Sequence, residues 1–391
     1  MKPGWRWMGA CAWAAGAMLL GACAGPPSAP LASASLDDAV RQLMQREQVK
    51  GLALAVIEHG QVVKVAAYGQ RNVAKALPLT PDTVMYGASL TKAAFGYMVM
   101  QLADEGRLSL DAPLAQLLPQ PLPKYGDAKR GYADLAGDER WRQLTPRMLL
   151  THSSGFANFR WVEADQRLQF HFDPGSRYAY SGEGINLLQF VLEKGLGLDV
   201  GQEMQRRIFD RFGMTRTSMR WRPDFANNLA DGYQLDGSEL PHDERSNVRA
   251  AGSMDTTIAD QARMWAGFMR GDGLSPAARA EWIKGQLPIT SAHQFPTFLP
   301  PTETRYQAIG LSAALGVVRF DDASGPAWLK GGHDDATGNM ALCLEAGQRC
   351  IVLLANDVRA ERLYPALAER VLGATRMPWQ WEYDWWQPPA P

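Results

Sequence analysis

Apolar, strand-like runs lie at both ends of this chain of 391 residues, whereas the long middle part carries mainly helical patterns. Near the N-terminus, the runs at residues 52–57 and 62–68 flank a turn at residues 58–61, which predicts an antiparallel hairpin. The strands expected near the C-terminus, and the helix that closes it, cover residues 309–320, 340–344, 350–356 and 360–372. A sheet must then be assembled from both termini around an inserted helical subdomain at about residues 90–240. The predicted fold class is therefore α/β (α+β), an antiparallel sheet flanked by N- and C-terminal helices with an all-helical insertion.

The composition is that of a folded domain with little net charge. Apolar residues make up 46% of the chain, and the formal net charge is −1. The apolar content excludes a disordered chain, and the lack of a Lys and Arg excess argues against nucleic acid as a partner. Four Cys and six scattered His are too few for a disulfide scaffold or a large metal cluster, so we expect no metal and no cofactor.

The first residues carry the pattern of an export signal. Lys2 and Arg6 precede an apolar run of about fourteen residues, which is too short to cross a ~30 Å hydrocarbon core. The run ends in Leu20-Gly21-Ala22-Cys23, which resembles a bacterial lipoprotein box and implies that Cys23 becomes the lipidated first residue. Ordinary signal cleavage at this site, which would release a soluble protein, and a buried N-terminal helix are the alternatives.

This pattern divides the chain into four segments. They are a signal peptide at residues 1–22, a flexible Pro-, Ala-, Gly- and Ser-rich tether at 23–35, a main domain at 36–373 and a Trp-rich tail at 374–391. Removal of the signal takes away two basic residues and changes the net charge from −1 to −3. We expect the mature protein at the bacterial cell envelope, attached to the membrane by its N-terminal lipid and facing the periplasm or the surface. A soluble secreted or periplasmic protein is the alternative, and the oligomeric state is not predicted.

Two cysteines remain beyond the signal region, Cys343 and Cys350. A hairpin centred on Ala346-Gly347 would place them directly opposite each other, within reach of a disulfide bond in an oxidising compartment. Two buried free thiols are the alternative.

The first chemical motif is Ser89-Leu90-Thr91-Lys92, at the start of an apolar helical run. Positions i and i+3 share one face of a helix, so the Lys92 amine can approach the Ser89 hydroxyl. A serine at a helix N-terminus also meets the positive end of the dipole and free backbone N–H groups. Burial lowers the pKa of a lysine, which lets it accept a proton from serine near neutral pH. Alone the motif is weak, because most such pairs are a capping serine and an exposed lysine.

Two further motifs carry a phenol and a glycine pair. Tyr180, within Tyr178-Ala179-Tyr180-Ser181-Gly182, could relay a proton beside a Ser–Lys pair. Lys330 precedes Gly331 and Gly332, and glycines at this point let a substrate come close to strand N–H groups. In isolation, a packing tyrosine and a plain turn would explain these two motifs.

Taken together and in order, the three motifs resemble those of the serine β-lactamase and penicillin-binding-protein superfamily. The branch with class C β-lactamases, D-aminopeptidases and carboxylesterases, whose middle motif carries Tyr, is the most similar. Supporting stretches that match this branch are Leu149-Leu150-Thr151-His152-Ser153-Ser154-Gly155, Pro174-Gly175, Ala250-Ala251-Gly252-Ser253-Met254 with Asp260, and Ile351-Val352-Leu353-Leu354-Ala355-Asn356. The resemblance covers about residues 36–373 and implies a serine hydrolase.

The resemblance also implies a role for each motif residue. Ser89 would be the acylated nucleophile, with Lys92 and Tyr180 as the general-base pair that activates it. The oxyanion hole would consist of the backbone N–H groups of Ser89 and His333, each donor lowering the barrier by roughly 2.7–4 kcal/mol. Lys330 would hold the proton network and the local positive field. His152 lies in a stretch that, in this family, holds a turn.

Two departures from the family pattern concern substrate binding. Gly182 stands where the family has an Asn that contacts a substrate amide, and Gly331 stands where it has a hydroxyl that helps to bind a substrate carboxylate. Together with Gly332, these positions are the predicted substrate-binding backbone. Both losses weaken the case for β-lactams and D-Ala-D-Ala ends as substrates. Glu183 could supply a contact near the missing amide, although we expect a solvated loop carboxylate.

Aromatic residues cluster in one loop and in the tail. Trp161 and its neighbours Phe156, Phe159 and Arg160 are expected either to line the mouth of a cleft, where Trp161 would contact substrate, or to pack in the core. The tail holds four Trp, whose spacing predicts an extended segment with one apolar face laid on the domain. Contact with a membrane interface or a partner is the alternative for the tail.

Three hypotheses for function follow. The first is an envelope-anchored serine hydrolase that cleaves small esters or amides through a Ser89 acyl-enzyme. The second is a D,D-carboxypeptidase, penicillin-binding protein or β-lactamase, with a cell-wall-derived substrate or a β-lactam. The third is a catalytically silent binding or sensor lipoprotein on the same fold, for which Gly182 and Gly331 are the motivation.

Overall fold

The computed structural model describes residues 35–126 and 131–387. The predicted signal, the lipidation site Cys23 and nearly all of the tether lie outside the described residues. Within the described part of the chain, no helix is both long and apolar enough to cross a membrane.

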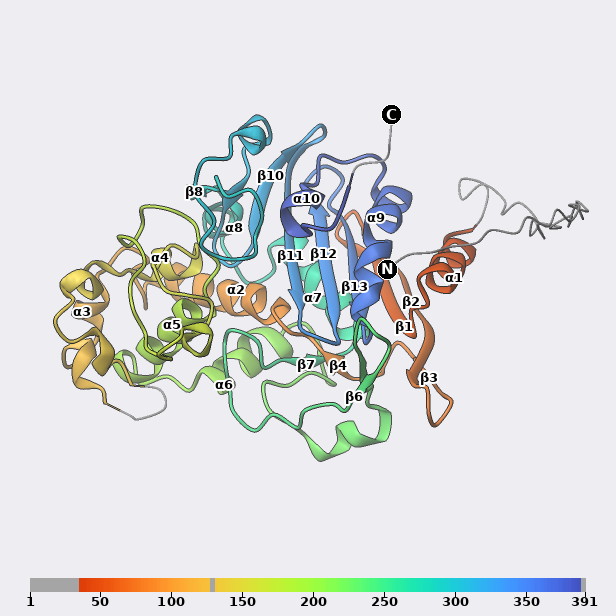
Figure 1. Cartoon of the computed structure of the whole chain (residues 1–391), viewed down its shortest axis with the longest axis horizontal. Helices are drawn as coiled ribbons and strands as arrows, with labels where there is room; N and C mark the ends of the chain where they lie inside the picture. Colours follow the sequence, from red (N-terminus) through yellow and green to blue (C-terminus); the bar gives the residue numbers. More distant parts are fainter. Residues whose placement is uncertain (1–34, 127–130, 388–391) are drawn as a thin grey trace, which may run out of the picture.

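A nine-stranded sheet joins the two ends of the chain (Figure 1). In sheet order, its strands are β3 Leu77–Pro78, β2 Gln61–Asn72, β1 Gly51–Glu58, β13 Arg349–Ala355, β12 Gly338–Leu344, β11 Gly325–His333, β10 Val318–Asp322, β9 Ser312–Ala313 and β8 Leu287–Pro288. Every pairing in it is antiparallel, and β1 pairs with both β2 and β13. The prediction of an antiparallel sheet assembled from both termini is confirmed.

Helices cover both faces of the sheet. The terminal helices α1 Leu36–Glu47 and α9 Tyr364–Leu372 pack together on one face, and α7 Ile258–Arg270 packs against β1, β2 and β13 on the other. Strand β1 is consequently buried at its first seven positions. Burial on both faces explains why its sequence is a continuous apolar run rather than an alternating one.

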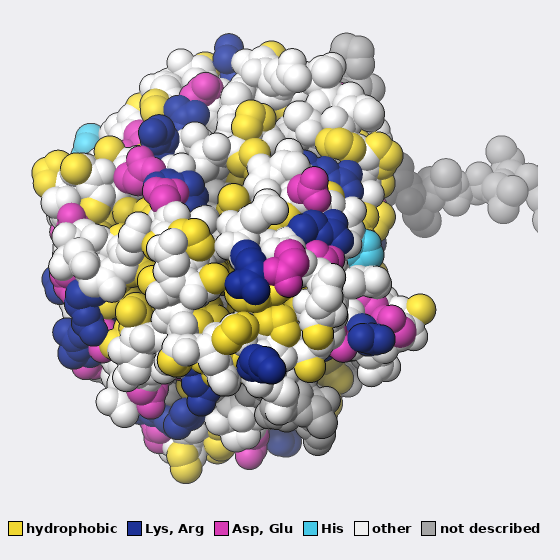
Figure 2. Space-filling view, turned by 90° about the vertical axis from the view of Figure 1, so that its left-hand side faces the viewer, with side chains coloured by type: hydrophobic (Ala, Val, Ile, Leu, Met, Phe, Trp, Pro, Cys, Tyr) yellow, Lys and Arg dark blue, Asp and Glu magenta, His cyan; other side chains and the backbone are white. Residues whose placement is uncertain are grey.

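The helical part occupies the left of Figure 1, beside the sheet. Its helices are α3 Leu114–Leu117, α4 Pro146–Leu150, α5 Gly182–Gly195 and α6 Val200–Met204. Helix α2, Leu90–Asp104, connects this part to the sheet, because it contacts β11, β12, α6 and α8 Pro276–Ile283 and is buried along nearly its whole length. On the face drawn in Figure 2, Lys and Arg side chains lie interspersed with Asp and Glu.

Short elements complete the structure. The two small sheets consist of β4 Met85–Tyr86 with β7 Asp255–Thr256, and β5 Gly232–Tyr233 with β6 Glu239–Leu240. The 3₁₀ and π turns are η2 Leu122–Lys124, η3 Ala133–Leu135, η4 Glu139–Gln143, η5 Arg160–Val162, η6 Gln205–Phe209, η7 Pro223–Asn228, η8 Arg305–Ile309 and η9 Val358–Leu363. The last α-helix is α10 Trp379–Glu382.

The expectations for the C-terminal part need three corrections. Residues 309–320 are not one strand, because Gly310 and Gly316 adopt left-handed backbone angles (φ 56° and 94°) and interrupt it around β9. The closing helix begins as the 3₁₀ turn η9 and becomes α-helical only at α9, whose first turn contains a proline. Strand β11, which carries the Lys330 motif, was not among the expected strands.

The Trp-rich tail also differs from the expected extended segment. It forms the helical turn α10, with Trp381 fully buried and Trp379 8% exposed. The indole N–H of Trp381 donates to the hydroxyl of Ser291 at 3.3 Å. Trp385, farther along, is 44% exposed. A helical turn after Pro378 therefore buries the first two indoles, whereas an extended strand would have put Trp379, Trp381 and Trp385 on one face and Trp386 on the other.

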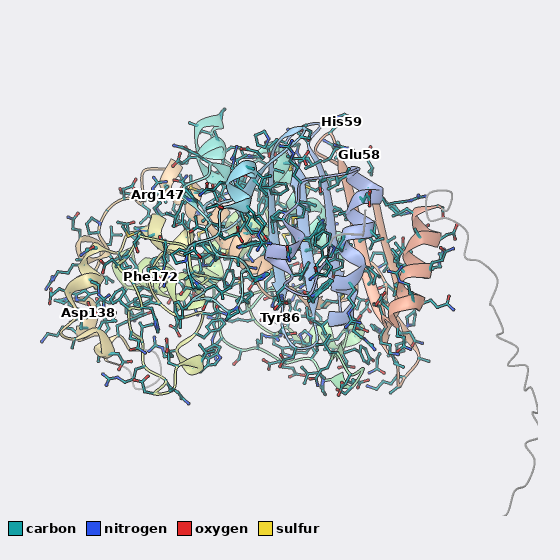
Figure 3. All side chains as sticks on the ribbon, turned by 45° about the horizontal axis from the view of Figure 1, so that its top comes forward. Glu58, His59, Tyr86, Asp138, Arg147 and Phe172 are labelled. Atoms are coloured by element: carbon teal, nitrogen blue, oxygen red, sulfur yellow. A yellow bond between two sulfur atoms is a disulfide. The ribbon has the colours of Figure 1, made fainter. Side chains whose placement is uncertain are left out.

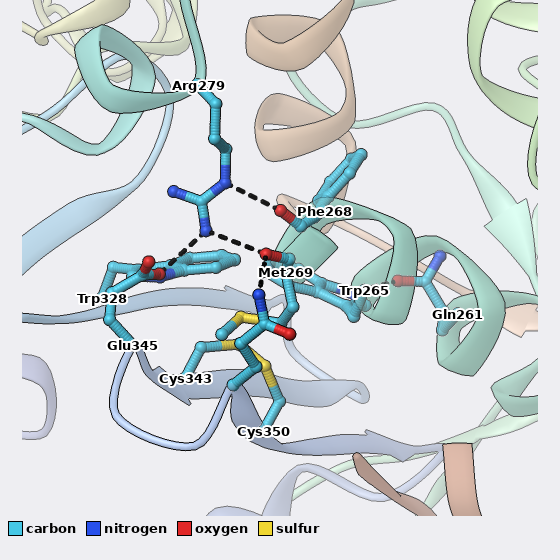
Figure 4. The surroundings of a disulfide bond; sticks show 10 residues. Gln261, Trp265, Phe268, Met269, Arg279, Trp328, Cys343, Glu345 and Cys350 are labelled. Carbon is cyan, nitrogen blue, oxygen red and sulfur yellow. Dashed lines mark hydrogen bonds and ion pairs between the residues drawn. A yellow bond between two sulfur atoms is a disulfide. The ribbon is translucent and has the colours of Figure 1, made fainter. Parts of the chain in front are cut away.

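Cys343 and Cys350 lie directly opposite each other on β12 and β13, and their sulfur atoms are bonded (Figure 4). Side chains from other elements hold the hairpin turn next to the disulfide. A carboxylate oxygen of Glu345 accepts hydrogen bonds from the indole of Trp328 at 2.6 Å and from Arg279 at 2.8 Å. The disulfide thus closes the end of the β12–β13 hairpin against α7 and α8.

Candidate active site

A cleft of about 600 Å³ lies where the N-terminus of α2, the end of β11 and the tail meet the helical part. Tyr86 is one of the residues that line this cleft. In Figure 3 it lies where the sheet meets the helical part, far from Asp138 at the outer end of the helical part. Eight residues predicted from sequence line the cleft together, namely Ser89, Lys92, Trp161, Tyr180, Lys330, Gly331, Gly332 and His333. The structure therefore brings all three motifs to one place. Gly182 is not among the residues that line it.

Ser89 forms the N-cap of α2, so its hydroxyl stands at the positive end of a long buried helix. The residue before it, Ala88, has a left-handed backbone (φ 46°), a costly conformation for a residue with a Cβ and one that clusters at functional sites. Strand β11 comes very close at this point, since a Cβ on Gly332 would lie 3.0 Å from the backbone N of Ser89. Glycine at 332 is therefore what lets the strand approach the helix N-terminus.

Lys92 stands one turn into α2, directly under the serine. Its Nζ lies 2.9 Å from Oγ of Ser89 and 2.5 Å from the carbonyl oxygen of Ala251. The side chain is almost completely buried. Burial, and secondly the positive charge of Lys330, hold the pKa of Lys92 well below its usual value of 10.5. A neutral amine can donate to Ala251 and still present its lone pair to the Ser89 hydroxyl.

Tyr180 lies between the two lysines. Its hydroxyl accepts a hydrogen bond from Nζ of Lys330 at 3.3 Å, and Nζ of Lys92 lies 4.9 Å from the centre of its ring. Burial raises the pKa of the Tyr180 phenol strongly, and its hydrogen bond with Ser89 acts in the opposite direction. The phenol is thus neutral around pH 7, so that of the two predicted bases Lys92 is suited to accept the proton and Tyr180 to relay it.

His152 fixes the position of the tyrosine. Its ring stacks on that of Tyr180 with centres 4.3 Å apart, and its Nδ1 accepts from the backbone N–H of Ser181 at 3.1 Å. Burial, reinforced by the two lysine charges, holds the pKa of His152 well below 6.5. A neutral histidine in this place orients Tyr180 without adding charge.

The end of β11 offers an open backbone edge to the cleft. Pairing between β10 and β11 stops at Val318 opposite Leu329, whereas β11 continues through Lys330 to His333. Within the described residues, no strand pairs with that side of the last four positions. Free N–H groups at such an edge can bind a carbonyl oxygen, as proposed for His333.

Neighbouring side chains fill the space left at Gly182. A Cβ on Gly182 would lie 2.4 Å from the ring of Phe159, and the Gly182 N–H donates to the side-chain oxygen of Asn158 at 3.0 Å. Asn158 itself lines the cleft and places a carboxamide beside the glycine. Sequence reasoning missed this residue, because nothing local distinguishes it from an ordinary loop asparagine.

The loop around Trp161 divides between core and cleft. Phe156 is fully buried, whereas Trp161 is 53% exposed and stacks on Phe159 at the cleft mouth, with ring centres 4.1 Å apart. The expectation of a solvated Glu183 is wrong, since this carboxylate is buried and accepts from Arg160 at 3.1 Å. The ion pair joins the start of α5 to the aromatic loop, which explains its burial.

The tail contributes a residue that the sequence did not indicate. Glu382, at the end of α10, is 5% exposed and lines the cleft beside Lys330 and Gly331. Burial lowers the pKa of Lys330 to about 8, and the negative charge of Glu382 opposes that shift. The sequence indicates such a group only indirectly. The glycine at 331, where the family has a residue with a hydroxyl side chain, leaves room for a group from elsewhere in the chain.

Among the described residues, no group of three or more His, Cys, Asp and Glu side chains could hold a metal ion. The groups that the arrangement itself brings together are a serine hydroxyl, a buried amine, a phenol and the backbone N–H groups at the edge of β11.

The pH dependence of Ser89 reactivity should follow the titration of Lys92. A protonated lysine cannot accept the serine proton, so labelling of Ser89 by a fluorophosphonate should slow as the pH falls through the Lys92 pKa, well below 10.5. Replacement of Lys330 by Met removes a positive charge that disfavours the Lys92 ammonium, so the acidic limb should move to higher pH. The labelling rate constant, measured against pH for both proteins, checks this. A limb that stays in place or moves down would contradict it.

The chain is similar in sequence to several known proteins. A family model described as Beta-lactamase matches residues 36–375. The chain is 29% identical over 207 residues to a lovastatin esterase from Penicillium rubens, with 46% of this chain and 51% of the relative covered. It is 27% identical over 191 residues to a D-aminopeptidase from Gluconobacter oxydans, with 47% of this chain and 35% of the relative covered. The chain thus spans about half or less of the length of these curated relatives.

A solved D-alanine carboxypeptidase from Burkholderia cenocepacia has a similar fold. Its TM-score is 0.67 at 20% sequence identity, over 86% of this chain and 97% of that one. At this identity the likeness extends to the fold alone.

Proposed function

Because this chain belongs to the beta-lactamase family and is a serine hydrolase, we propose that it cleaves ester or small amide bonds through an acyl-enzyme on Ser89. The observation that carries the proposal is the contact of 2.9 Å between the buried amine of Lys92 and the Ser89 hydroxyl. A buried lysine of lowered pKa is a base that can work near neutral pH.

Acylation would begin with attack of Ser89 Oγ on the substrate carbonyl carbon while its proton passes to Nζ of Lys92. The oxyanion would accept hydrogen bonds from the backbone N–H groups of Ser89 and His333. When the tetrahedral intermediate collapses, the bond to the leaving group breaks, and that group takes the proton from Lys92 by way of the Tyr180 hydroxyl. Water then attacks the ester with the same base, which releases the acid and restores Ser89.

The proposed location is the cell envelope, with the protein held by a lipid on Cys23. The lipoprotein-like sequence Leu20-Gly21-Ala22-Cys23 supports this location. The Cys343–Cys350 pair supports it as well, because disulfides persist in oxidising compartments.

A substrate panel on the purified mature protein tests the function. The panel contains a p-nitrophenyl ester, a D-amino-acid p-nitroanilide and a chromogenic β-lactam, each given to wild type and to Ser89→Ala. We expect turnover of the ester that depends on Ser89. Turnover of the β-lactam alone would favour the second hypothesis, and absence of Ser89-dependent turnover of all three would overturn the proposal in favour of a silent binding protein.

A further inference from the structure

We propose that Glu382 determines substrate specificity, by occupying the place beside Lys330 where a substrate carboxylate would otherwise bind. The inference rests on the proposed function and narrows it. The enzyme would select acyl substrates that carry no negative charge next to the bond that is cleaved.

The space beside Gly331 is already occupied. A Cβ built on Gly331 would lie 1.9 Å from Oε1 of Glu382, a distance that no side chain tolerates. The carboxylate therefore stands where a threonine or serine at 331 would have its side chain. A hydroxyl at that position is replaced by a carboxylate from a segment more than fifty residues away in sequence.

The Glu382 carboxylate is held firmly by hydrogen bonds. Its Oε2 accepts from the amide of Gln294 at 3.0 Å, and the other end of that amide accepts from the Tyr178 hydroxyl at 3.1 Å. All three side chains are buried. The Glu382 carboxylate is thus a fixed part of the wall, not a mobile surface group.

The backbone of α10 is fixed in the same way. The backbone N–H of Gln294 donates to the carbonyl oxygen of Trp381 at 2.8 Å. Nδ1 of His293 lies 2.7 Å from the backbone carbonyl oxygen of Gln380. The buried indole of Trp381 anchors the turn in the core below. A substrate cannot displace Glu382 without extracting these groups from the core, at a large cost in burial.

The charges of Lys330 and Glu382 also disfavour a substrate carboxylate. Lys330 and Glu382 are both buried in the same corner and interact electrostatically, so the positive field of the lysine is already balanced. A substrate carboxylate entering there would lose water, meet a lysine whose charge Glu382 already opposes and face the carboxylate of Glu382 itself. An uncharged ester or amide would meet none of these penalties.

The test uses two aryl esters that differ only in a carboxylate or a carboxamide on the leaving group, next to the scissile bond. Their kcat/KM values are measured for wild type, Glu382→Gln and the control Asp384→Asn, which removes an exposed acid two residues farther along the tail. We expect wild type to prefer the neutral ester. Glu382→Gln should raise the relative kcat/KM of the carboxylate ester by about 10- to 100-fold, since the variant removes a like charge from the place where the substrate carboxylate would bind. Asp384→Asn should leave that ratio within about twofold.

A ratio that does not change in Glu382→Gln would overturn the inference, provided that the variant unfolds at the same temperature as wild type. If Gln at 382 prevents folding, Glu382→Ala gives a second measurement of the same ratio. Competition of phenylboronic acid and its 3-carboxy analogue against fluorophosphonate labelling gives a third readout that requires no turnover. Equal competition in wild type would also contradict the inference. Failure of wild type to hydrolyse either ester would instead count against the proposed function, so the two failures are distinguishable.

Discussion

Replacement of Ser89 by Ala should abolish covalent labelling by a fluorophosphonate and lower ester turnover by at least about 10³-fold. The physical reason is that Oγ of Ser89 is the proposed site of acylation, and alanine removes the hydroxyl that lies 2.9 Å from Nζ of Lys92. The fold should not suffer, because the N-cap side chain of α2 makes no capping hydrogen bond. Intact-protein mass spectrometry measures the adduct, and a chromogenic ester measures turnover.

Ser246→Ala is the matched control for this experiment. Ser246 also lines the cleft, but it lies exposed and is not the N-cap of a helix. This variant should be labelled at the wild-type rate. Labelling that persists in Ser89→Ala and disappears in Ser246→Ala would place the nucleophile elsewhere.

Replacement of Lys92 by Met should lower kcat/KM by about 10²- to 10⁴-fold, the range expected for loss of a general base. Methionine has a similar length and needs no water, so it can occupy the buried site without the desolvation penalty that lowers the lysine pKa. The melting temperature should therefore stay the same or rise while activity falls. Steady-state kinetics and thermal unfolding on one preparation separate these two effects.

Lys124→Met is the control, because Lys124 is exposed at the end of η2 and is not among the residues that line the cleft. Its kinetics should match wild type. If Lys92→Met kept nearly full activity while Lys330→Met lost it, the base would be Lys330, and the proton path through Tyr180 would have to run in the opposite direction.

Local sequence patterns predicted the parts of the fold in which the contacting residues are close together in the sequence. A short turn at residues 58–61 fixes the β1–β2 hairpin, and the turn at Gly347 places Cys343 opposite Cys350. The approach of Lys92 to Ser89 likewise depends only on helical spacing. In each case the relevant geometry is set within about ten residues.

The rest of the site depends on contacts between distant segments. Nothing in the local sequence around Glu382 predicts a buried acid, because its burial comes from packing of α10 against the segment around Gln294. Asn158 and Phe159 fill the place of a missing side chain at Gly182 for the same reason. Gly182 and Gly331 indicate from sequence that a side chain of the family pattern is missing. Only the three-dimensional structure identifies the residues that fill its place.

Segments from the C-terminal part of the sequence complete the cleft, and this has a consequence for when the enzyme becomes active during synthesis. Helix α2, which begins after the proposed nucleophile Ser89, starts at Leu90. Strand β11, which completes the cleft, starts only at Gly325, and Glu382 follows still later in the sequence. Contacts of such large sequence separation form late, because a long loop must close first. A chain still being made can therefore hold Ser89 and Lys92 side by side without a complete cleft around them. Hydrolysis would report that the final strands and the tail have docked, which makes the catalytic rate a direct readout of finished folding.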